Sequence, residues 1–215
     1  MLDRKRQSRI RSAFVATANE CQTNEESYKM KEIQVKSIMI PMENYIKVTK
    51  EDSLIDVLQA LENARSSGES HAHRDALVVD ATGDFLGKVT MIDIFKALEP
   101  NYRKMGVNVD EVIAGGKGEL TRALIVDAID DFDLWVDPVK TLCERGAALK
   151  VSEVMHTPDE LEYIDEEDSL EKALHRYVMG IHQPLIVRRG DTVTGVLRFG
   201  DLFETVREGL LSCAV

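Results

Sequence analysis

Two related segments of this chain carry a polar residue followed, three positions later, by an aspartate. Thr90 and Asp93 lie in the segment GKVTMIDIF, and Arg198 and Asp201 lie in the later segment GVLRFGDLF. In each case an apolar run typical of a strand precedes the polar residue, and an amphipathic pattern typical of a helix follows it. The first N–H groups of such a helix have no partner within the helix, so they can bind an anion. Both segments are therefore candidate anion sites.

The first pair also has an interpretation that needs no ligand. Thr90 and Asp93 have the spacing of a capping box, in which each side chain bonds the backbone N–H of the other residue. Taken alone, this spacing favours capping over ligand binding. The recurrence of the segment later in the chain is the observation that favours binding. Arg198 cannot cap a helix as threonine does, but it can pair with a phosphate as a fixed cation. It could equally fill an empty cleft.

An internal repeat contains both segments. Val35–Met39 is matched by Val151–Met155, and the Asp-Ser-Leu triplet ending at Leu54 is matched at the same spacing by the triplet ending at Leu170. Further along the chain the matches come at a shorter spacing. The first copy therefore has extra residues, which we place within Ser66–His73.

Each copy predicts the order strand, helix, strand, strand, helix. The last strands are expected over 85–89 and 192–197, and apolar residues at helical spacing after Leu54 and Leu170 predict amphipathic helices. A copy of about 60 residues is small for a core of its own, so we expect the two copies to pack as a pair. The closing helices are expected to turn these side chains inward: Met91, Ile94, Phe95, Leu98, Phe199, Leu202, Phe203 and Val206.

Two segments lie outside the copies. The first eleven residues carry five basic side chains against one acidic, and such an arm is either a solvated end or a contact for phosphate or acidic lipid. Between the copies, a helical face can be formed by Leu120, Ala123, Leu124, Ala128 and Phe132. The expected division is a basic, partly helical arm (1–32), the first copy (33–99), a helical insertion (100–149) and the second copy (150–215).

The composition is that of a water-soluble globular protein, with 215 residues, 44% hydrophobic and 30% charged. No apolar run approaches the ~20 residues that span a bilayer, and the amino terminus has no apolar signal core. Three widely spaced cysteines suggest no disulfide framework or Cys-x-x-Cys metal site, so we expect a cytoplasmic protein without membrane contact. The net charge of −11 argues against a nucleic-acid surface over most of the chain.

The same motifs occur twice in the chain and in the same order. This arrangement resembles the cystathionine β-synthase (CBS) domain in the tandem form called a Bateman module. The likeness rests on the Val-to-Met segments, the Asp-Ser-Leu triplets, the apolar strands around Val78 and Ile186, and the two Gly-x-x-[Thr/Arg]-x-x-Asp segments. The resemblance covers about 33–99 and 150–210. It implies an α/β (α+β) fold, a tandem CBS pair in which each copy is β-α-β-β-α.

The resemblance also implies ligand-binding residues. In this family the cleft between the two copies takes an adenosine-type ligand, the threonine position helps to hold phosphate, and the aspartate accepts hydrogen bonds from the ribose. Thr90 and Asp93 would form one half-site, and Arg198 and Asp201 the other, although the family usually has a hydroxyl residue where this chain has Arg198. The remaining expected contacts lie at strand starts and after the leading methionines: Asp75, Ala76, Leu77, His182, Gln183, Pro184, Ile40, Pro41, His156 and Thr157.

Other motifs are weaker. The glycines around Lys117 fail the phosphate-loop pattern at two positions, 111 and 118. His71 and His73 could contact a metal, but spacing suggests no third ligand. The acids between Asp127 and Asp137 lack the glycine and closing glutamate of a calcium loop. Because no catalytic constellation stands out, we expect no enzyme, no bound metal and no obligatory cofactor.

The leading hypothesis is a non-enzymatic regulatory module. It would bind an adenine nucleotide (AMP or ATP) or a related ligand such as NADH or S-adenosylmethionine, and transmit occupancy to an unidentified partner protein. Because members of the family that this chain resembles commonly pair their modules face to face, we also expect a homodimer. The alternative is a ligand-free dimerisation or scaffold protein, and a nucleic-acid regulator acting through the basic arm is the third. The sequence does not choose the ligand, the number of occupied sites or the partner.

Overall fold

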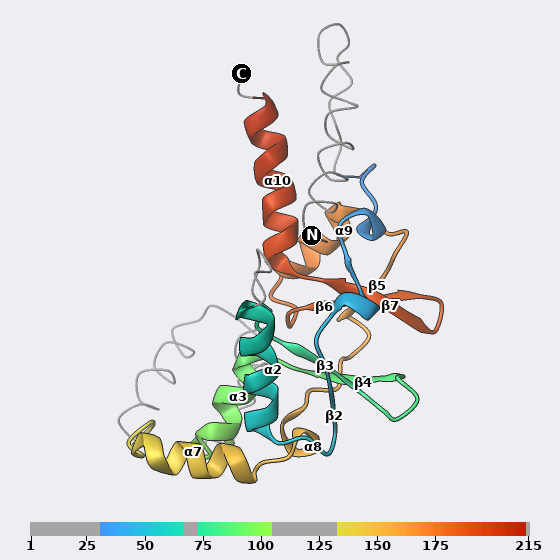
Figure 1. Ribbon diagram of the computed structural model, residues 1–215. Coiled ribbons are helices and arrows are strands. Elements are labelled where there is room, and N and C mark those ends of the chain that lie inside the picture. The colour runs from blue at the N-terminus through green and yellow to red at the C-terminus, as the bar shows by residue number, and fades with distance from the viewer. Residues whose placement is uncertain (1–30, 67–72, 105–132, 214–215) are drawn as a thin grey trace, which may run out of the picture. The chain divides into compact units, whose positions relative to one another are not determined.

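The computed structural model describes residues 31–66, 73–104 and 133–213 (Figure 1). The chain is mixed α/β and forms two compact units, unit 1 (Met1–Tyr45 with Pro158–Val215) and unit 2 (Ile46–Thr157). The elements, in chain order, are η1 (Val35–Ser37), β1 (Ile40–Pro41), η2 (Met42–Asn44), β2 (Lys47–Thr49), α2 (Leu54–Ser66), β3 (Ala76–Val79), β4 (Phe85–Val89), α3 (Met91–Leu98), α4 (Asn101–Lys104), α7 (Val139–Ala148), α8 (Val151–Val154), β5 (Tyr163–Asp165), α9 (Leu170–Val178), β6 (Leu185–Arg189), β7 (Thr192–Leu197) and α10 (Phe199–Cys213).

Unit 2 is built on a three-stranded sheet in the order β2-β3-β4. Strand β2 runs parallel to β3, and β4 returns antiparallel to it through a turn in which Gly83 has a φ of 90°. Helix α7 crosses α2 and α3 (Figure 1), and Gly146 of α7 lies against side chains of both, Ile55 and Leu98. The order β2, α2, β3, β4, α3 confirms the prediction for the first copy.

Unit 1 is built on a four-stranded sheet in the order β1-β7-β6-β5. Strand β5 is parallel to β6, and the β6–β7 and β7–β1 pairs are antiparallel. Helices α9 and α10 pack on one side of this sheet (Figure 1), over a core that includes Leu170, Leu185, Leu197 and Leu202. The order β5, α9, β6, β7, α10 confirms the prediction for the second copy, and the predicted bounds of β4 and β7 are those observed.

The leading segments of the two repeats are exchanged. Val35 and Ile38, from the first repeat, are buried in the core of unit 1, and β1 completes its sheet beside β7. Val151 and Val154, from the second repeat, are buried in the core of unit 2. Each compact unit therefore combines residues of both repeats. The division of the chain at residues 32, 99 and 149 stays a prediction.

Two glycines allow this exchange. A Cβ on Gly195 would lie 2.5 Å from the Ile40 carbonyl oxygen, and a Cβ on Gly87 would lie 2.6 Å from the His156 carbonyl oxygen. Both separations are shorter than a carbon and an oxygen tolerate, so only glycine lets the exchanged backbone approach each strand this closely. The glycine that recurs in the two segments is thereby explained by packing.

The start of helix α2 uses the capping pattern expected from the Asp-Ser-Leu triplet. The Ser53 hydroxyl accepts a hydrogen bond from the Asp56 N–H at 3.2 Å, and the Asp56 carboxylate accepts from the Ser53 N–H at 2.8 Å. The hydrogen bonds donated by Ser53 lower the pKa of Asp56 below its usual value. In the second copy, Ser169 precedes α9 but makes no such side-chain bond.

The prediction for the closing helices is wrong at four positions. Ile94 and Leu202 are buried as expected, and Leu98 and Val206 are partly buried. By contrast, Met91 and Phe95 of α3 are 42% and 49% exposed. Phe199 and Phe203 of α10 are 40% and 55% exposed. The helical spacing identified apolar residues correctly, but α3 and α10 are apolar on more than one face, and only one face packs on the sheet of each unit.

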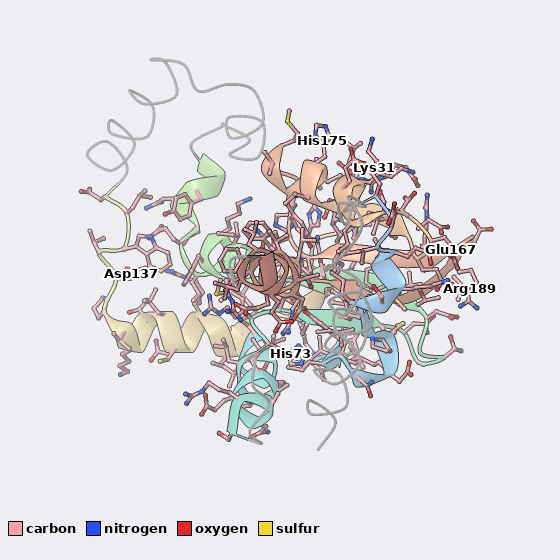
Figure 2. The ribbon with its side chains drawn as sticks, turned by 90° about the horizontal axis from the view of Figure 1, so that it is seen from above. Lys31, His73, Asp137, Glu167, His175 and Arg189 are labelled. Carbon is pink, nitrogen blue, oxygen red and sulfur yellow. The ribbon has the colours of Figure 1, made fainter. Side chains whose placement is uncertain are left out.

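The arm (1–30), His71 and the helical face from Leu120 to Phe132 lie outside the described residues. The described ends of the insertion are helical, as α4 and α7. Figure 2 shows Asp137 beside the start of α7, where its carboxylate accepts from Arg145 at 2.6 Å. None of the helices in the described ranges combines the length and apolar character needed to cross a membrane.

Replacing either close-approach glycine should destabilise the protein. We expect Gly87→Ala and Gly195→Ala each to lower the free energy of unfolding by about 1–3 kcal/mol, the range for overpacking, because the exchanged backbone must move away. Urea unfolding followed by circular dichroism measures the change.

Gly200→Ala is the matched control. A Cβ at Gly200, in the first turn of α10, meets no atom within 4 Å, so this variant should be unchanged or up to about 1 kcal/mol more stable. Equal stability of all three variants would contradict the packing explanation.

Candidate functional site

The predicted ligand residues separate into two groups, one in each unit. We call the group in unit 2 the Thr90 site: Asp75, Ala76, Leu77, Thr90, Asp93 and Thr157. We call the group in unit 1 the Arg198 site: Ile40, His182, Gln183, Pro184, Arg198 and Asp201.

Thr90 and Asp93 form a capping box at the start of α3. The Asp93 carboxylate oxygen Oδ2 accepts from the Thr90 N–H at 2.8 Å and from the Thr90 hydroxyl at 2.7 Å. In return, the Asp93 N–H donates to the Thr90 hydroxyl oxygen at 3.4 Å. The capping interpretation of this pair is confirmed.

Capping leaves half of the Asp93 carboxylate open. Both hydrogen bonds end on Oδ2, and Oδ1 accepts none from the residues that the structure describes. Asp93 is 9% exposed, so its position is fixed by the helix while one acceptor oxygen stays available. An ionised carboxylate is acceptor-only, and such an oxygen suits a hydroxyl donor. Capping and binding are therefore compatible at this residue.

The start of β3 lies beside Thr90. Ala76 pairs with Val89, the residue before Thr90, and continuing this antiparallel register sets Asp75 opposite Thr90. Ala76 and Leu77 are fully buried, and the Leu77 N–H donates to the Ile46 carbonyl at 2.9 Å. The parallel pairing with β2 therefore occupies the Leu77 N–H, and a contact between this strand start and a ligand stays a prediction.

Thr157 reaches this site through the exchanged segment. His156 and Lys88 exchange both backbone hydrogen bonds, at 2.8 and 2.9 Å, two residues before Thr90. Thr157 follows and is exposed. Lys88 itself is fully buried, and sequence reasoning missed it. The signal was a lysine in an otherwise apolar strand, where the second repeat has Val196.

The Arg198 site has the same backbone plan with a different polar pair. The Arg198 Nε donates to Asp201 Oδ2 at 2.8 Å, and Nη2 donates to Oδ1 at 3.0 Å. The two side chains are 13% and 7% exposed. This is a bidentate, charge-assisted pair, which is stronger than a bond between neutral groups. Both oxygens of Asp201 are therefore engaged, in contrast to Asp93.

The other predicted residues surround this pair on two strands. Ile40 pairs with Val196, two residues before Arg198. Leu185 pairs with Leu197, which sets Pro184 opposite Arg198 when the register continues. Strand β6 begins at Leu185, so His182, Gln183 and Pro184 precede it rather than open it, and the Gln183–Pro184 bond is cis.

His182 lies beside a buried acid. Its Nδ1 is 3.5 Å from Oε2 of Glu162, which is 3% exposed. Gln183 is exposed and Pro184 is buried. The sequence alone did not show which site each leading segment belongs to. In the structure, Ile40 belongs to the unit of the Arg198 site, and Thr157 belongs to the unit of the Thr90 site.

Solved structures with the same fold come from several organisms. A CBS domain-containing protein of unknown function from Bacillus anthracis is 18% identical, covers 83% of this chain and 96% of its own, and has a TM-score of 0.53. The CBS-pair protein CBSX2 from Arabidopsis thaliana is 18% identical over 81% of this chain and 94% of its own, with a TM-score of 0.51. CBSX2 in complex with AMP is 16% identical over 81% and 97%, with a TM-score of 0.50. At these identities the likeness shows the fold alone.

A search of curated proteins gives no significant match. The family model for the CBS domain matches twice, at residues 35–100 and 151–208, which together are more than half of the chain. These ranges contain both repeats and both Gly-x-x-[Thr/Arg]-x-x-Asp segments. The chain therefore belongs to the CBS domain family and carries two copies of the domain in tandem.

Proposed function

We propose that this protein is a non-enzymatic regulatory module that binds an adenine nucleotide, or a related adenosyl compound, at the Thr90 site and the Arg198 site. The observation that carries the proposal is the Asp93 carboxylate, fixed by capping through Oδ2 while Oδ1 has no hydrogen-bond partner among the described residues. The AMP complex of a protein with the same fold supports the choice of ligand class.

The chemistry of the Thr90 site matches the parts of a nucleotide. Asp93 Oδ1 can accept hydrogen bonds from ribose hydroxyls, since a carboxylate with an open oxygen suits a diol. The start of α3, with backbone N–H groups and a positive helix dipole, suits a phosphate. Asp75, at the start of the neighbouring strand, is partly exposed and lies where a base could contact the backbone.

To transmit ligand occupancy to a partner protein, the module needs a second surface, and the closing helices α3 and α10 provide one. Met91 and Phe95 on α3 are exposed, and so are Phe199 and Phe203 at the equivalent positions of α10. The same apolar face is thus repeated in both units, which supports a homodimer that covers it. A ligand would regulate a partner in the cytoplasm only by binding one arrangement of the module better than another.

The alternative is a ligand-free dimerisation or scaffold protein. The Arg198–Asp201 pair favours it, because a site whose carboxylate is fully engaged from within needs no ligand. The two functions differ in whether nucleotides bind at all.

Ligand binding should raise the melting temperature. At about a hundred times its dissociation constant, a ligand adds ~2.7 kcal/mol to stability. For a chain of this size that is a rise of roughly 5–10 °C. A thermal-shift panel of AMP, ATP, NADH, adenosine and S-adenosylmethionine makes the measurement, with GMP as the base-specificity control. A shift below one degree with every adenosyl compound would support the scaffold alternative.

Asp93→Asn should weaken nucleotide binding selectively. It keeps the shape but removes the charge, so affinity at the Thr90 site should fall by about 1.5–3 kcal/mol, the range for a hydrogen bond to a charged group. Isothermal titration calorimetry with AMP measures the loss.

Asp56→Asn is the matched control for capping. Asp56 makes the same box with Ser53 at the start of α2 but lies outside the site. Its replacement should lower stability slightly and leave AMP affinity unchanged. If both variants bind AMP as the wild type does, Asp93 only builds the fold.

A further inference from the structure

We infer that the segment Asp133–Asp137 is coupled to ligand binding at the Thr90 site through the end of helix α3. This segment lies between the two CBS domains, just before α7, and its Trp135 is anchored on α3. Occupancy of the Thr90 site strengthens this anchor, and the anchor in turn strengthens ligand binding. The inference rests on the proposed function and names the part of the chain that responds to the ligand.

Trp135 is held against the end of α3 by three contacts. Its backbone N–H donates to Glu99 Oε2 at 2.7 Å, and its ring packs edge-on against Phe95 with the ring centroids 5.9 Å apart. Its Nε1 donates to the Tyr102 hydroxyl at 3.1 Å. Glu99 is the C-cap residue of α3 and is 2% exposed, so its bond to Trp135 is shielded from water. We call these three contacts the Trp135 anchor.

The same segment is tied to α3 a second time. Asp137 (labelled in Figure 2) accepts from Arg145 Nη2 at 2.6 Å, and Arg145 Nη1 donates to the carbonyl oxygen of Leu98, the last residue of α3. A cation at this place also suits the negative end of the helix dipole. The position of the segment therefore depends on where the last turn of α3 lies.

The backbone of the anchored segment is strained. Asp133 and Trp135 have φ angles of 47° and 61°, in the left-handed region that residues other than glycine rarely adopt. A residue keeps such a conformation only when the surrounding contacts hold it there. The strain and the Trp135 anchor thus oppose each other, so the free-energy difference between the anchored form and a released form is small.

Helix α3 joins the Trp135 anchor to the Thr90 site. It has eight residues, Met91–Leu98, and a helix of that size is about 12 Å long. Helices this short are marginal by themselves and depend on contacts with the rest of the protein. Thr90 and Asp93 hold the first turn, where the proposed ligand binds, and the anchor holds the last turn. Ligand and anchor stabilise the same arrangement of α3, so each strengthens the other.

The closing helix of the other unit does not need this support. Helix α10 has 15 residues, Phe199–Cys213, and buries Leu202 in the core of unit 1. A helix of that length makes more hydrogen bonds of its own and depends less on a contact at its end. The coupling is therefore assigned to the Thr90 site and not to the Arg198 site.

The fluorescence of Trp135 measures the anchor, because this is the only tryptophan in the chain. The measurement is the quenching of its emission by acrylamide, with and without saturating AMP, in the wild type and in Glu99→Gln. That variant leaves one acceptor oxygen for the N–H groups of Asn101 and Trp135, which raises the released population. AMP should lower the quenching constant in Glu99→Gln. With Asp93→Asn added, the same response should require a higher AMP concentration.

The coupling must also act in the reverse direction, because linkage is reciprocal. Trp135→Ala removes the ring contacts and should lower AMP affinity at the Thr90 site at least about fivefold, the lower end of usual couplings. Calorimetry measures the affinity, and the Thr90 site is the binding step that Asp93→Asn weakens. Val136→Ala is the matched control, because Val136 is the next residue and is 69% exposed. Its AMP affinity should be unchanged.

Melting curves verify that each variant folds. If Trp135→Ala does not fold, calorimetry on Glu99→Gln takes its place, and its AMP affinity at the Thr90 site should also be lower than that of the wild type. Trp135→Phe keeps a ring against Phe95 and should lose less affinity than Trp135→Ala.

The outcomes separate this inference from the proposed function. AMP binding that leaves the quenching of Trp135 unchanged in Glu99→Gln would overturn the inference. So would wild-type AMP affinity at the Thr90 site in Trp135→Ala, or an equal loss of affinity in Val136→Ala. In each case calorimetry still shows nucleotide binding, and the proposed function stands. If the wild type binds no adenosyl compound, the proposed function fails and the inference fails with it.

Discussion

The close approach of an exchanged backbone to Gly87 and Gly195 is the contact on which both units depend. At Gly195 it lets β1 pair with β7, and at Gly87 it lets His156 pair with Lys88. The segments held in this way also deliver core residues, Val35 to unit 1 and Val151 to unit 2. A side chain at either glycine would separate the strand from its partner, so the sheet edge and the core would be disturbed together. Each copy is small, and exchange adds apolar burial that a copy of this size lacks by itself.

The same plan supports two different polar pairs. Each site has a closing strand, a polar residue, and an aspartate in the first turn of the closing helix. In unit 2 the polar residue is a threonine that fixes Asp93 and leaves one oxygen open. In unit 1 it is an arginine that engages Asp201 completely. The two sites therefore differ in charge, because an uncharged hydroxyl contacts Asp93 and a guanidinium contacts Asp201. The two sites thus share a backbone plan and differ in the side chain that precedes the closing helix.

The closing helices connect the sites to the surface. Helix α3 carries Asp93 in its first turn. It buries Ile94 and Ala97 against the sheet and exposes Met91 and Phe95. Helix α10 repeats this arrangement with Leu202 inside and Phe203 outside. A rigid helix that carries a ligand contact at its start and an apolar face along its length can pass a small displacement to whatever covers that face. The proposed regulatory function relies on this property of α3 and α10.

Local patterns in the sequence determined the repeat, the element order, the bounds of β4 and β7, and the capping geometry of Thr90 and Asp93. These features depend on neighbours a few residues apart, such as the turn residues before β7 and the apolar spacing of α9. The tertiary structure alone decided three others. The leading segments of the repeats carry similar apolar residues and could serve either core, so only long-range packing shows that they are exchanged. Met91 and Phe203 lie on the exposed faces of their helices because spacing identifies apolar residues but not which face meets the sheet. Arg198 bonds Asp201 because both are held, largely buried, at one helix start, where each charge is most stable beside the other.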